Sequence, residues 1–184
     1  NVARLRWLNP LTRDFLAAAE ETQFPRNDDF NGARQDGFGP HSVTQKNGQR
    51  WSSARAFLHP VLNRPNLAVM HDSLTLRVRF EGKRAVGVTV RTQGVERALS
   101  AKREVILAGG TFNSPQLLLL SGIGPADHLR AMGIEVVHHL PGVGRNLHDH
   151  PSAWVQVEDR SARSFGLSAR SLPWLAAAAV SYVL

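Results

Sequence analysis

The sequence predicts a mixed fold, of the α+β or α/β class, in which a small antiparallel sheet is combined with short helices. Residues 74 to 101 give the first signal, because apolar and polar side chains alternate there in segments that two glycine-containing turns separate. The second is the wholly apolar run Val105–Ala108, which two glycines and a helix start follow. Apolar residues at helical spacing between residues 9 and 22 give the third.

The N-terminal part is predicted to hold one long helix, a loop and one short helix. Residues 9 to 22 begin with Asn-Pro, in which asparagine can cap the helix and proline suits its first turn. Residues 24 to 47 are rich in Pro, Asn, Asp and Gly, which predicts a loop. A short helix is expected over residues 54 to 58, with Pro60 ending it.

The middle of the chain is predicted to be mostly extended. A short apolar strand is expected over residues 67–70, and the strands of an antiparallel meander over residues 74–80, 85–91 and 96–101. Val105–Ala108 is apolar throughout, which favours a strand buried on both faces, as in a parallel sheet. Ser114-Pro115 is then expected to open a helix over residues 116 to 120. Further predicted elements are a helix over 127–132, an extended segment over 134–138, a turn over 141–144 and a helix over 172–184.

Composition excludes several classes of protein. The 184 residues contain no cysteine, which excludes disulfides, thiolate metal sites and cysteine nucleophiles. The formal net charge of +7 comes mostly from arginines scattered along the chain, which favours a solvated basic surface over a nucleic-acid site. The apolar run 172–184 is shorter than the roughly 20 residues of a membrane-spanning helix.

Two groups of residues could carry chemistry. The paired glycines after Val105–Ala108 would let the backbone approach an anionic ligand at a helix start, or would serve only the packing of a tight turn. His138, His139, His148, Asp149 and His150 invite a metal site, with capping or packing as the alternative. A hydrolase triad with a serine is not favoured, because the chain has no Gly-x-Ser-x-Gly motif.

Several longer motifs resemble a known family. Residues 110–125 closely resemble the second signature of the glucose–methanol–choline (GMC) oxidoreductases, and residues 140–151 resemble the turn that follows it. Upstream segments resemble the family in the expected order, namely residues 27–32, 37–39, 51–55 and 64–67. The resemblance runs from about residue 9 to the end of the chain and is nearest to choline-dehydrogenase-like bacterial members.

The resemblance implies an FAD-dependent enzyme that oxidises an alcohol CH–OH group by hydride transfer to the flavin, with a histidine as base. It implies part of an FAD-binding Rossmann-like domain with an antiparallel meander, and part of a substrate-binding domain. Residues 1–65 are assigned to helix and loops that belong partly to the substrate-domain or FAD-lid region. Residues 66–150 are assigned to the FAD-binding domain, and residues 151–184 to the start of the substrate-binding domain.

The resemblance also implies cofactor-binding positions, at Thr75, Ala108, Gly109, Gly110, Asn146 and Leu147. Thr75 stands where the family has a strand residue, usually valine, whose main chain meets the adenine. Ala108, Gly109 and Gly110 match the segment that passes the adenosine part of FAD, although the family often has alanine where this chain has Gly110. No catalytic residue and no metal ligand is assigned within the chain.

We expect the flavin-loop glycines to precede residue 1 and the catalytic histidine to follow residue 184, so that the isolated chain is inactive. Expected partners are an alcohol, the rest of the same polypeptide and an acceptor, oxygen or quinone, while exposed apolar surface would favour self-association. The expected location is the cytoplasm, or the periphery of the inner membrane. A non-catalytic binding or scaffold domain of the same fold and a histidine-based metal-binding module remain the alternatives.

Overall fold

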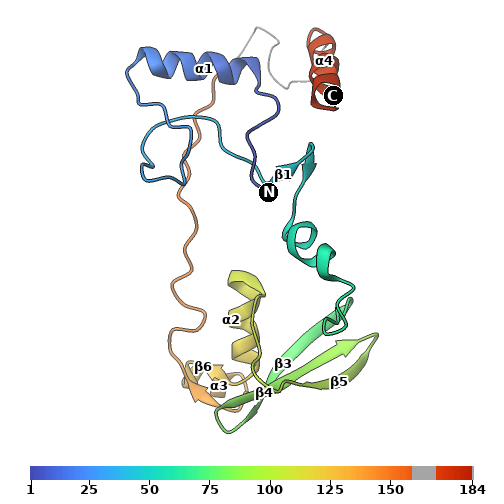
Figure 1. Ribbon diagram of the computed structural model, residues 1–184. Helices are drawn as coiled ribbons and strands as arrows, with labels where there is room; N and C mark the ends of the chain where they lie inside the picture. The colour runs from blue at the N-terminus through green and yellow to red at the C-terminus, as the bar shows by residue number, and fades with distance from the viewer. Residues whose placement is uncertain (159–168, 184) are drawn as a thin grey trace. The chain divides into compact units, whose positions relative to one another are not determined.

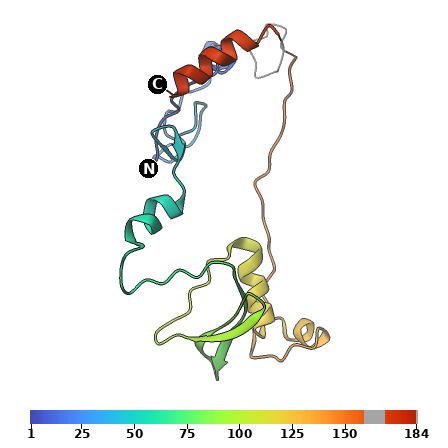
Figure 2. The same ribbon diagram turned by 90° about the vertical axis from the view of Figure 1, so that its right-hand side faces the viewer.

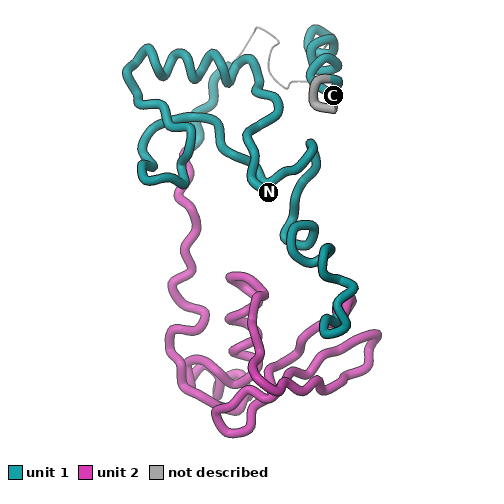
Figure 3. The backbone as a smooth tube through the Cα atoms, in the orientation of Figure 1, with its two compact units in different colours: residues 1–68, 154–184 teal, residues 69–153 magenta. Residues whose placement is uncertain are grey.

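The computed structural model describes residues 1–158 and 169–183. The chain divides into two compact units (Figure 3), of which one comprises residues 69–153 and the other residues 1–68 with 154–184. This division does not test the assignment of segments to flavin and substrate domains, which stays a prediction.

The unit of residues 1–68 and 154–184 contains two helices of about three turns. Helix α1, Pro10–Glu21, begins where predicted, because the Asn9 side-chain oxygen accepts a hydrogen bond of 2.9 Å from the Leu11 backbone N–H. The predicted C-terminal helix is α4, Leu172–Val183. Trp174 of α4 stacks on Trp7, with ring centroids 5.9 Å apart and planes 13° from parallel.

Several short elements follow α1 in this unit. Strands β1, Gln45–Lys46, and β2, Gln49–Arg50, form a hairpin. Its first strand lies at the end of residues 24–47, which were predicted to be a loop. The predicted helix over 54–58 is a π-helical turn, Ala54–Leu58. Pro60 does not end it but lies inside a 3₁₀ turn, His59–Val61, because a proline in a first turn loses no intrahelical hydrogen bond.

The unit of residues 69–153 is built around the predicted meander (Figures 1 and 2). Strands β3, Ser73–Glu81, β4, Arg84–Thr92, and β5, Val95–Ser100, pair antiparallel in the order β3-β4-β5. Gln93 and Gly94, with φ of 49° and 80°, form the kind of turn that matches the twist of a hairpin. The meander prediction is therefore confirmed.

One irregularity in β3 affects the geometry described below. The pairing of β3 with β4 shifts between Thr75 and Arg77, so that Leu76 is an extra residue opposite β4. Such a bulge bends the strand and changes which backbone groups face outward. Beyond it, Val78 is 5% exposed and belongs to the small core of this unit.

Helix α2 follows the paired glycines and contacts β3. It spans Gly110–Leu120, so the predicted start at residue 116 was wrong, and Pro115 lies inside the helix. Gly110 has a φ of +81°, which allows the chain to turn into the helix immediately after Gly109. The Ser114 hydroxyl consequently does not cap the first turn of α2.

The prediction of Val105–Ala108 as a strand buried on both faces was also wrong. The segment has no backbone hydrogen bond to another strand among the described residues, and Ile106 is 78% exposed. Residues 67–70 likewise lack a strand partner within the part of the chain that is described. An apolar run becomes a strand only when a neighbouring strand satisfies its backbone groups.

A small α/β element completes this unit. Strands β6, Ile123–Gly124, and β7, His138–His139, pair in parallel, and α3, Ala126–Ala131, lies between them in sequence. The helix predicted over 127–132 is thus confirmed, whereas only His138 of the extended segment 134–138 pairs as a strand. Leu129 of α3 is fully buried. None of the helices in the described residues has the length and apolar character needed to cross a membrane.

Candidate cofactor site

A hollow of about 540 Å³ lies between the meander and α2 and is called here the β3–α2 hollow. The meander contributes Leu74, Thr75 and Val88, and the unpaired segment contributes residues 105–109. Helix α2 contributes the remaining wall, Asn113, Ser114, Gln116, Leu117 and Leu120. The volume falls within the range of about 300–1,000 Å³ that is typical of small-molecule sites.

The glycines at one end of this hollow expose their backbone. A Cβ at Gly109 would lie 3.0 Å from the Cβ of Asn113, so a side chain would be crowded there. A Cβ at Gly110 would meet nothing within 4 Å, but the φ of +81° disfavours any other residue. Both glycines are exposed, so a ligand can approach the main chain there, while the crowding at Gly109 also fits a tight turn that serves packing alone.

A second hollow, of about 700 Å³, involves α2 and the turn after β7, and is called here the α2–turn hollow. Its walls are Thr111, Phe112, Pro115, Gln116, Leu118 and Leu119 of α2, with residues 142–148 of the turn. Asn146 has a φ of +57°, in the left-handed region that asparagine tolerates better than most residues. This conformation shapes the turn that carries Leu147.

The structure divides the predicted cofactor positions between the two hollows. Thr75, Ala108 and Gly109 line the β3–α2 hollow, while Asn146 and Leu147 line the α2–turn hollow. Gly110 lines neither, although it begins the helix that contributes to both. All six lie in the same compact unit, and whether they contact a cofactor stays a prediction.

Sequence reasoning missed the polar residues of α2 that line these hollows. Asn113 and Gln116 line the β3–α2 hollow, and Gln116 lines the α2–turn hollow as well. The signal that could have identified Asn113 and Gln116 was their spacing of three residues soon after the glycine pair, because residues three apart share a helix face. Arg145, which lines the α2–turn hollow, supplies a positive charge.

The chemistry of the β3–α2 hollow suits binding rather than proton transfer. Its lining contains no histidine, carboxylate, lysine or tyrosine, and its polar side chains are hydroxyls and amides. A general base must lie within hydrogen-bond reach of the proton that it removes. This hollow can therefore hold and orient a group, but it has no side chain that could act as the base.

The histidines do not form a cluster in the structure. His139 caps α3, since its Nδ1 accepts a hydrogen bond of 3.0 Å from the Ala126 backbone N–H. His150 lies 3.6 Å from Asp149, and both side chains are fully exposed. Among residues 1–158 and 169–183, no three histidine or acidic side chains gather where they could hold a metal ion. For His139, the structure supports capping.

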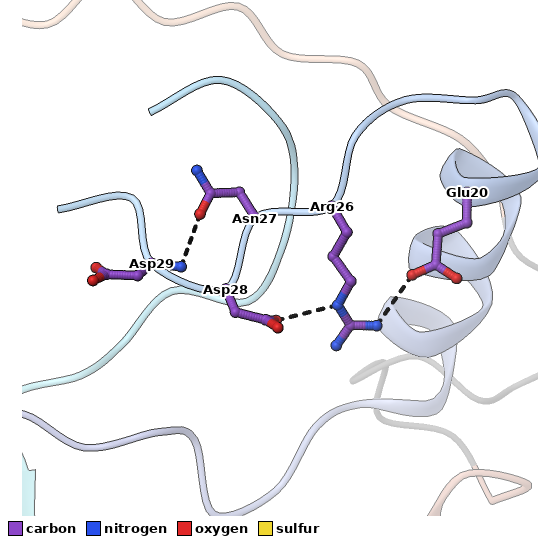
Figure 4. A network of polar contacts seen from close by, with 5 residues as sticks. All are labelled: Glu20, Arg26, Asn27, Asp28 and Asp29. Carbon is purple, nitrogen blue, oxygen red and sulfur yellow. Dashed lines mark hydrogen bonds and ion pairs between the residues drawn. The ribbon is translucent and has the colours of Figure 1, made fainter. Parts of the chain in front are cut away.

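A polar network fixes the loop after α1 in the other unit (Figure 4). Arg26 contacts Glu20 and Asp28 at 3.1 Å each, and these hydrogen bonds, with the attraction of both carboxylates, raise the pKa of its guanidinium. The Asn27 side chain accepts a hydrogen bond of 2.8 Å from the Asp29 N–H. It also donates one of 2.8 Å to the Arg34 carbonyl. These contacts hold the loop to itself and to the last turn of α1.

Comparison with known proteins identifies the family. The family model for the GMC oxidoreductases matches residues 2–152, which is most of the chain. The chain belongs to the GMC oxidoreductase family. This match confirms the family resemblance noted in the sequence. Members of this family bind FAD.

Similar GMC proteins include choline and alcohol dehydrogenases. The chain is 51% identical over 156 residues to the mitochondrial choline dehydrogenase of Mus musculus, covering 85% of this chain and 26% of that protein. It is 44% identical over 174 residues to an alcohol dehydrogenase [acceptor] of Pseudomonas putida, covering 94% of this chain and 32% of that protein. The chain thus spans about a quarter to a third of these relatives.

Solved GMC-like structures share the architecture. The chain superimposes on pyridoxine 4-oxidase from Mesorbium loti with a TM-score of 0.76 and 32% identity, over 81% of this chain and 30% of that one. A fungal aryl-alcohol oxidase matches with a TM-score of 0.64 and 28% identity, over 74% of this chain and 23% of that one. The mixed α/β fold with a three-stranded antiparallel sheet is therefore that of the flavin-binding region of this family.

Proposed function

We propose that this chain is part of an FAD-dependent oxidoreductase of the choline-dehydrogenase type, which moves hydride from an alcohol CH–OH group to flavin. The observation that carries the proposal is the similarity to choline and alcohol dehydrogenases at 51% and 44% identity, together with the hollow at the cofactor positions. The chain covers 26% and 32% of these two relatives, so the activity belongs to the whole enzyme.

The residues of the chain fit a role in holding FAD. The β3–α2 hollow has apolar walls, a few hydroxyl and amide groups, and an accessible backbone at Gly109-Gly110. Such a combination suits a flat heteroaromatic ring joined to a polar sugar. We therefore propose that Thr75, Ala108 and Gly109 line the part of the site nearest the adenosine, with Gly110 giving the backbone its turn.

The second group of positions would hold a different part of the cofactor region. Asn146 and Leu147 are set by a turn in which Gly144 and Asn146 both adopt positive φ. Arg145 beside them carries a charge that would favour an anionic group. In this proposal the α2–turn hollow contributes a wall to the FAD site rather than a catalytic centre.

When bound, FAD supplies the hydride acceptor, and the described residues orient it and exclude water from its surroundings. No side chain that lines the β3–α2 hollow can take the proton of the alcohol hydroxyl. His148 lines the α2–turn hollow but is exposed, so we do not assign it the role of base. The isolated chain is accordingly proposed to be inactive.

Other parts of the polypeptide are proposed to cover α2. The last turn of this helix, Leu117–Leu120, is apolar on every side, yet none of the helix residues is buried, and Phe112 and Leu120 are 72% and 50% exposed. Helices that are apolar all round are normally buried. Without such a cover, this surface would favour self-association of the chain. An alcohol and an electron acceptor, oxygen or quinone, complete the proposed partners.

The function is tested by the visible absorption spectrum of the full-length enzyme, recorded anaerobically before and after addition of choline and a panel of primary alcohols and polyols. The proposal predicts a flavin band that bleaches with at least one of them and so identifies the substrate. An enzyme that binds FAD but is bleached by no alcohol would contradict the proposed reaction. Absence of flavin after reconstitution with FAD would contradict the cofactor assignment as well.

A further inference from the structure

Two serine hydroxyls connect α2 to the two other walls of the β3–α2 hollow. Ser114 lies inside α2, and Ser121 is the residue that follows its last turn. Their separation of seven residues corresponds to two helical turns, and it places both side chains on nearly the same face. Neither residue belongs to the cofactor positions assigned from the family resemblance.

Ser121 ties the end of α2 to strand β3. Its hydroxyl oxygen accepts a hydrogen bond of 2.8 Å from the Val78 backbone N–H and donates one of 2.5 Å to the Leu117 carbonyl. The Ser121 side chain is buried, with 7% of the residue exposed. Val78 lies on the edge strand just beyond the bulge, so without Ser121 its N–H would be a buried donor lacking this partner.

Ser114 ties the start of α2 to the unpaired apolar segment. Its hydroxyl oxygen accepts a hydrogen bond of 3.0 Å from the Gly109 backbone N–H. Gly109 ends the segment that forms one wall of the hollow, and this segment has no strand partner among the described residues. The Ser114 contact therefore replaces part of what a neighbouring strand would provide.

We infer that Ser114 and Ser121 are positioning residues that set the spacing of the walls of the β3–α2 hollow and hold it ready for FAD. The inference rests on the proposed function. A wall that is already in place when the ligand arrives saves the ordering cost of binding. Removal of the Ser121 hydroxyl would loosen one wall without removing a lining group, whereas Ser114 also lines the hollow, so its removal tests the tie to Gly109 together with one lining hydroxyl.

The test compares serine variants of the full-length enzyme. Ser121→Ala and Ser114→Ala each remove one hydroxyl, while Ser121→Thr retains it. Ser73→Ala is the matched control, because the Ser73 hydroxyl also makes two hydrogen bonds on β3, to Thr92 and to the His71 carbonyl. Ser73 does not line the hollow. Flavin is removed from each variant, and the dissociation constant for added FAD is measured by the change in flavin fluorescence.

We expect Ser121→Ala and Ser114→Ala each to bind FAD about five- to tenfold more weakly, because each variant loses one hydrogen bond between α2 and a wall of the hollow. Ser73→Ala should bind FAD and turn over as the unmodified enzyme does, and Ser121→Thr should keep the affinity. In Ser121→Ala, whose side chain does not line the hollow, kcat at saturating FAD should be unchanged. Ser114→Ala keeps the test decisive if Ser121→Ala reduces folding, because Ser114 is less buried.

Three results would overturn the inference in different ways. Equal FAD affinity of Ser114→Ala, Ser121→Ala and Ser73→Ala would overturn the positioning role and leave the proposed function intact. An unmodified enzyme that binds no FAD at all would overturn the proposed function, and the inference with it. A fall in melting temperature that matches across all variants and accounts for the loss of affinity would reduce the serines to a structural role.

Discussion

The meander and the segment Val105–Ala108 lie in the same compact unit, and both are rich in β-forming residues, yet only the meander forms strands. Each strand of the meander has a neighbour two turn residues away in sequence, so pairing costs little loop entropy. The segment 105–108 has no partner among the described residues. Apolar character alone thus predicts burial, whereas a strand also requires a neighbouring backbone.

The largest expected effect comes from breaking the meander at Gly87. A Cβ there would lie 2.0 Å from the Leu99 carbonyl oxygen of the neighbouring strand, and the φ of +154° is one that other residues rarely adopt. Gly87→Ala should destabilise the unit by about 3 kcal/mol or more, because both backbone strain and overlap must be relieved. Amide hydrogen exchange of β4 and β5 measures the loss.

The matched control for this change is Gly82→Ala in the first turn of the meander. Gly82 also has a positive φ, of +58°, but a Cβ there would meet nothing within 4 Å. Only backbone strain remains, so the cost should be about 1 kcal/mol. Equal protection of the β4 and β5 amides in both variants would contradict the close packing of β4 against β5.

A pair of truncations sharpens the comparison at the level of side chains. Val78 of the meander is 5% exposed, and Ile106 of the unpaired segment is 78% exposed. In the 184-residue chain, Val78→Ala should cost about 2 kcal/mol and Ile106→Ala less than about 0.5 kcal/mol. Urea unfolding followed by far-UV circular dichroism gives both values. In the full-length enzyme, a cost of about 2 kcal/mol or more for Ile106→Ala would indicate that the rest of the polypeptide covers this segment.

Irregular backbone can also be satisfied without a strand, as the loop after α1 illustrates. The Asn27 amide group makes three hydrogen bonds, to Asp29, Arg34 and Asp36. Asn27→Ala should therefore destabilise this unit by about 1–2 kcal/mol. Arg26→Gln removes only exposed ion pairs and should lower the melting temperature much less than Asn27→Ala does. The effect of Arg26→Gln should decrease further in high salt, because salt screens exposed charges. Calorimetry of both variants ranks the two contributions, and a larger effect of Arg26→Gln would contradict this account.

The smallest effect is expected at Thr75. The family resemblance implies valine at this position in other members, and the proposed contact of residue 75 with the adenine is made by the main chain. Because the meander holds that main chain in place, Thr75→Val should leave the dissociation constant for FAD within about twofold. Titration of the flavin-free enzyme measures this constant. A loss of affinity of tenfold or more would mean that the threonine hydroxyl itself contacts the cofactor.

Local patterns predicted the elements whose partners are close in sequence. The meander, α1 and α3 followed from alternation, capping residues and glycines, and the structure has them within one or two residues of the expected ends. The strand at Val105–Ala108 failed, because its prediction depended on a neighbour that the local sequence cannot supply. The start of α2 failed because Pro115 was taken as a first-turn residue, whereas Gly110 already turns the chain into the helix.

The candidate site was predicted through family motifs rather than through physical patterns. From residues alone, a tight turn that serves packing was favoured at Gly109-Gly110 over a ligand-binding backbone. The division of the predicted positions between two hollows could not be foreseen, since it depends on α2 standing between segments distant in sequence. Hydrogen bonds such as that between Ser121 and Val78, 43 residues apart, are likewise visible only in the folded chain.

The central claim, that the β3–α2 hollow receives part of FAD, is tested most directly by filling the hollow in the full-length enzyme. Ala108→Phe places a ring in the hollow, and Ala98→Phe places the same ring on exposed β5, which does not line it. The flavin content after reconstitution and the dissociation constant for FAD are compared. The account predicts FAD binding at least tenfold weaker for Ala108→Phe and unchanged for Ala98→Phe. Unchanged FAD affinity in Ala108→Phe, with the fold intact, would contradict it.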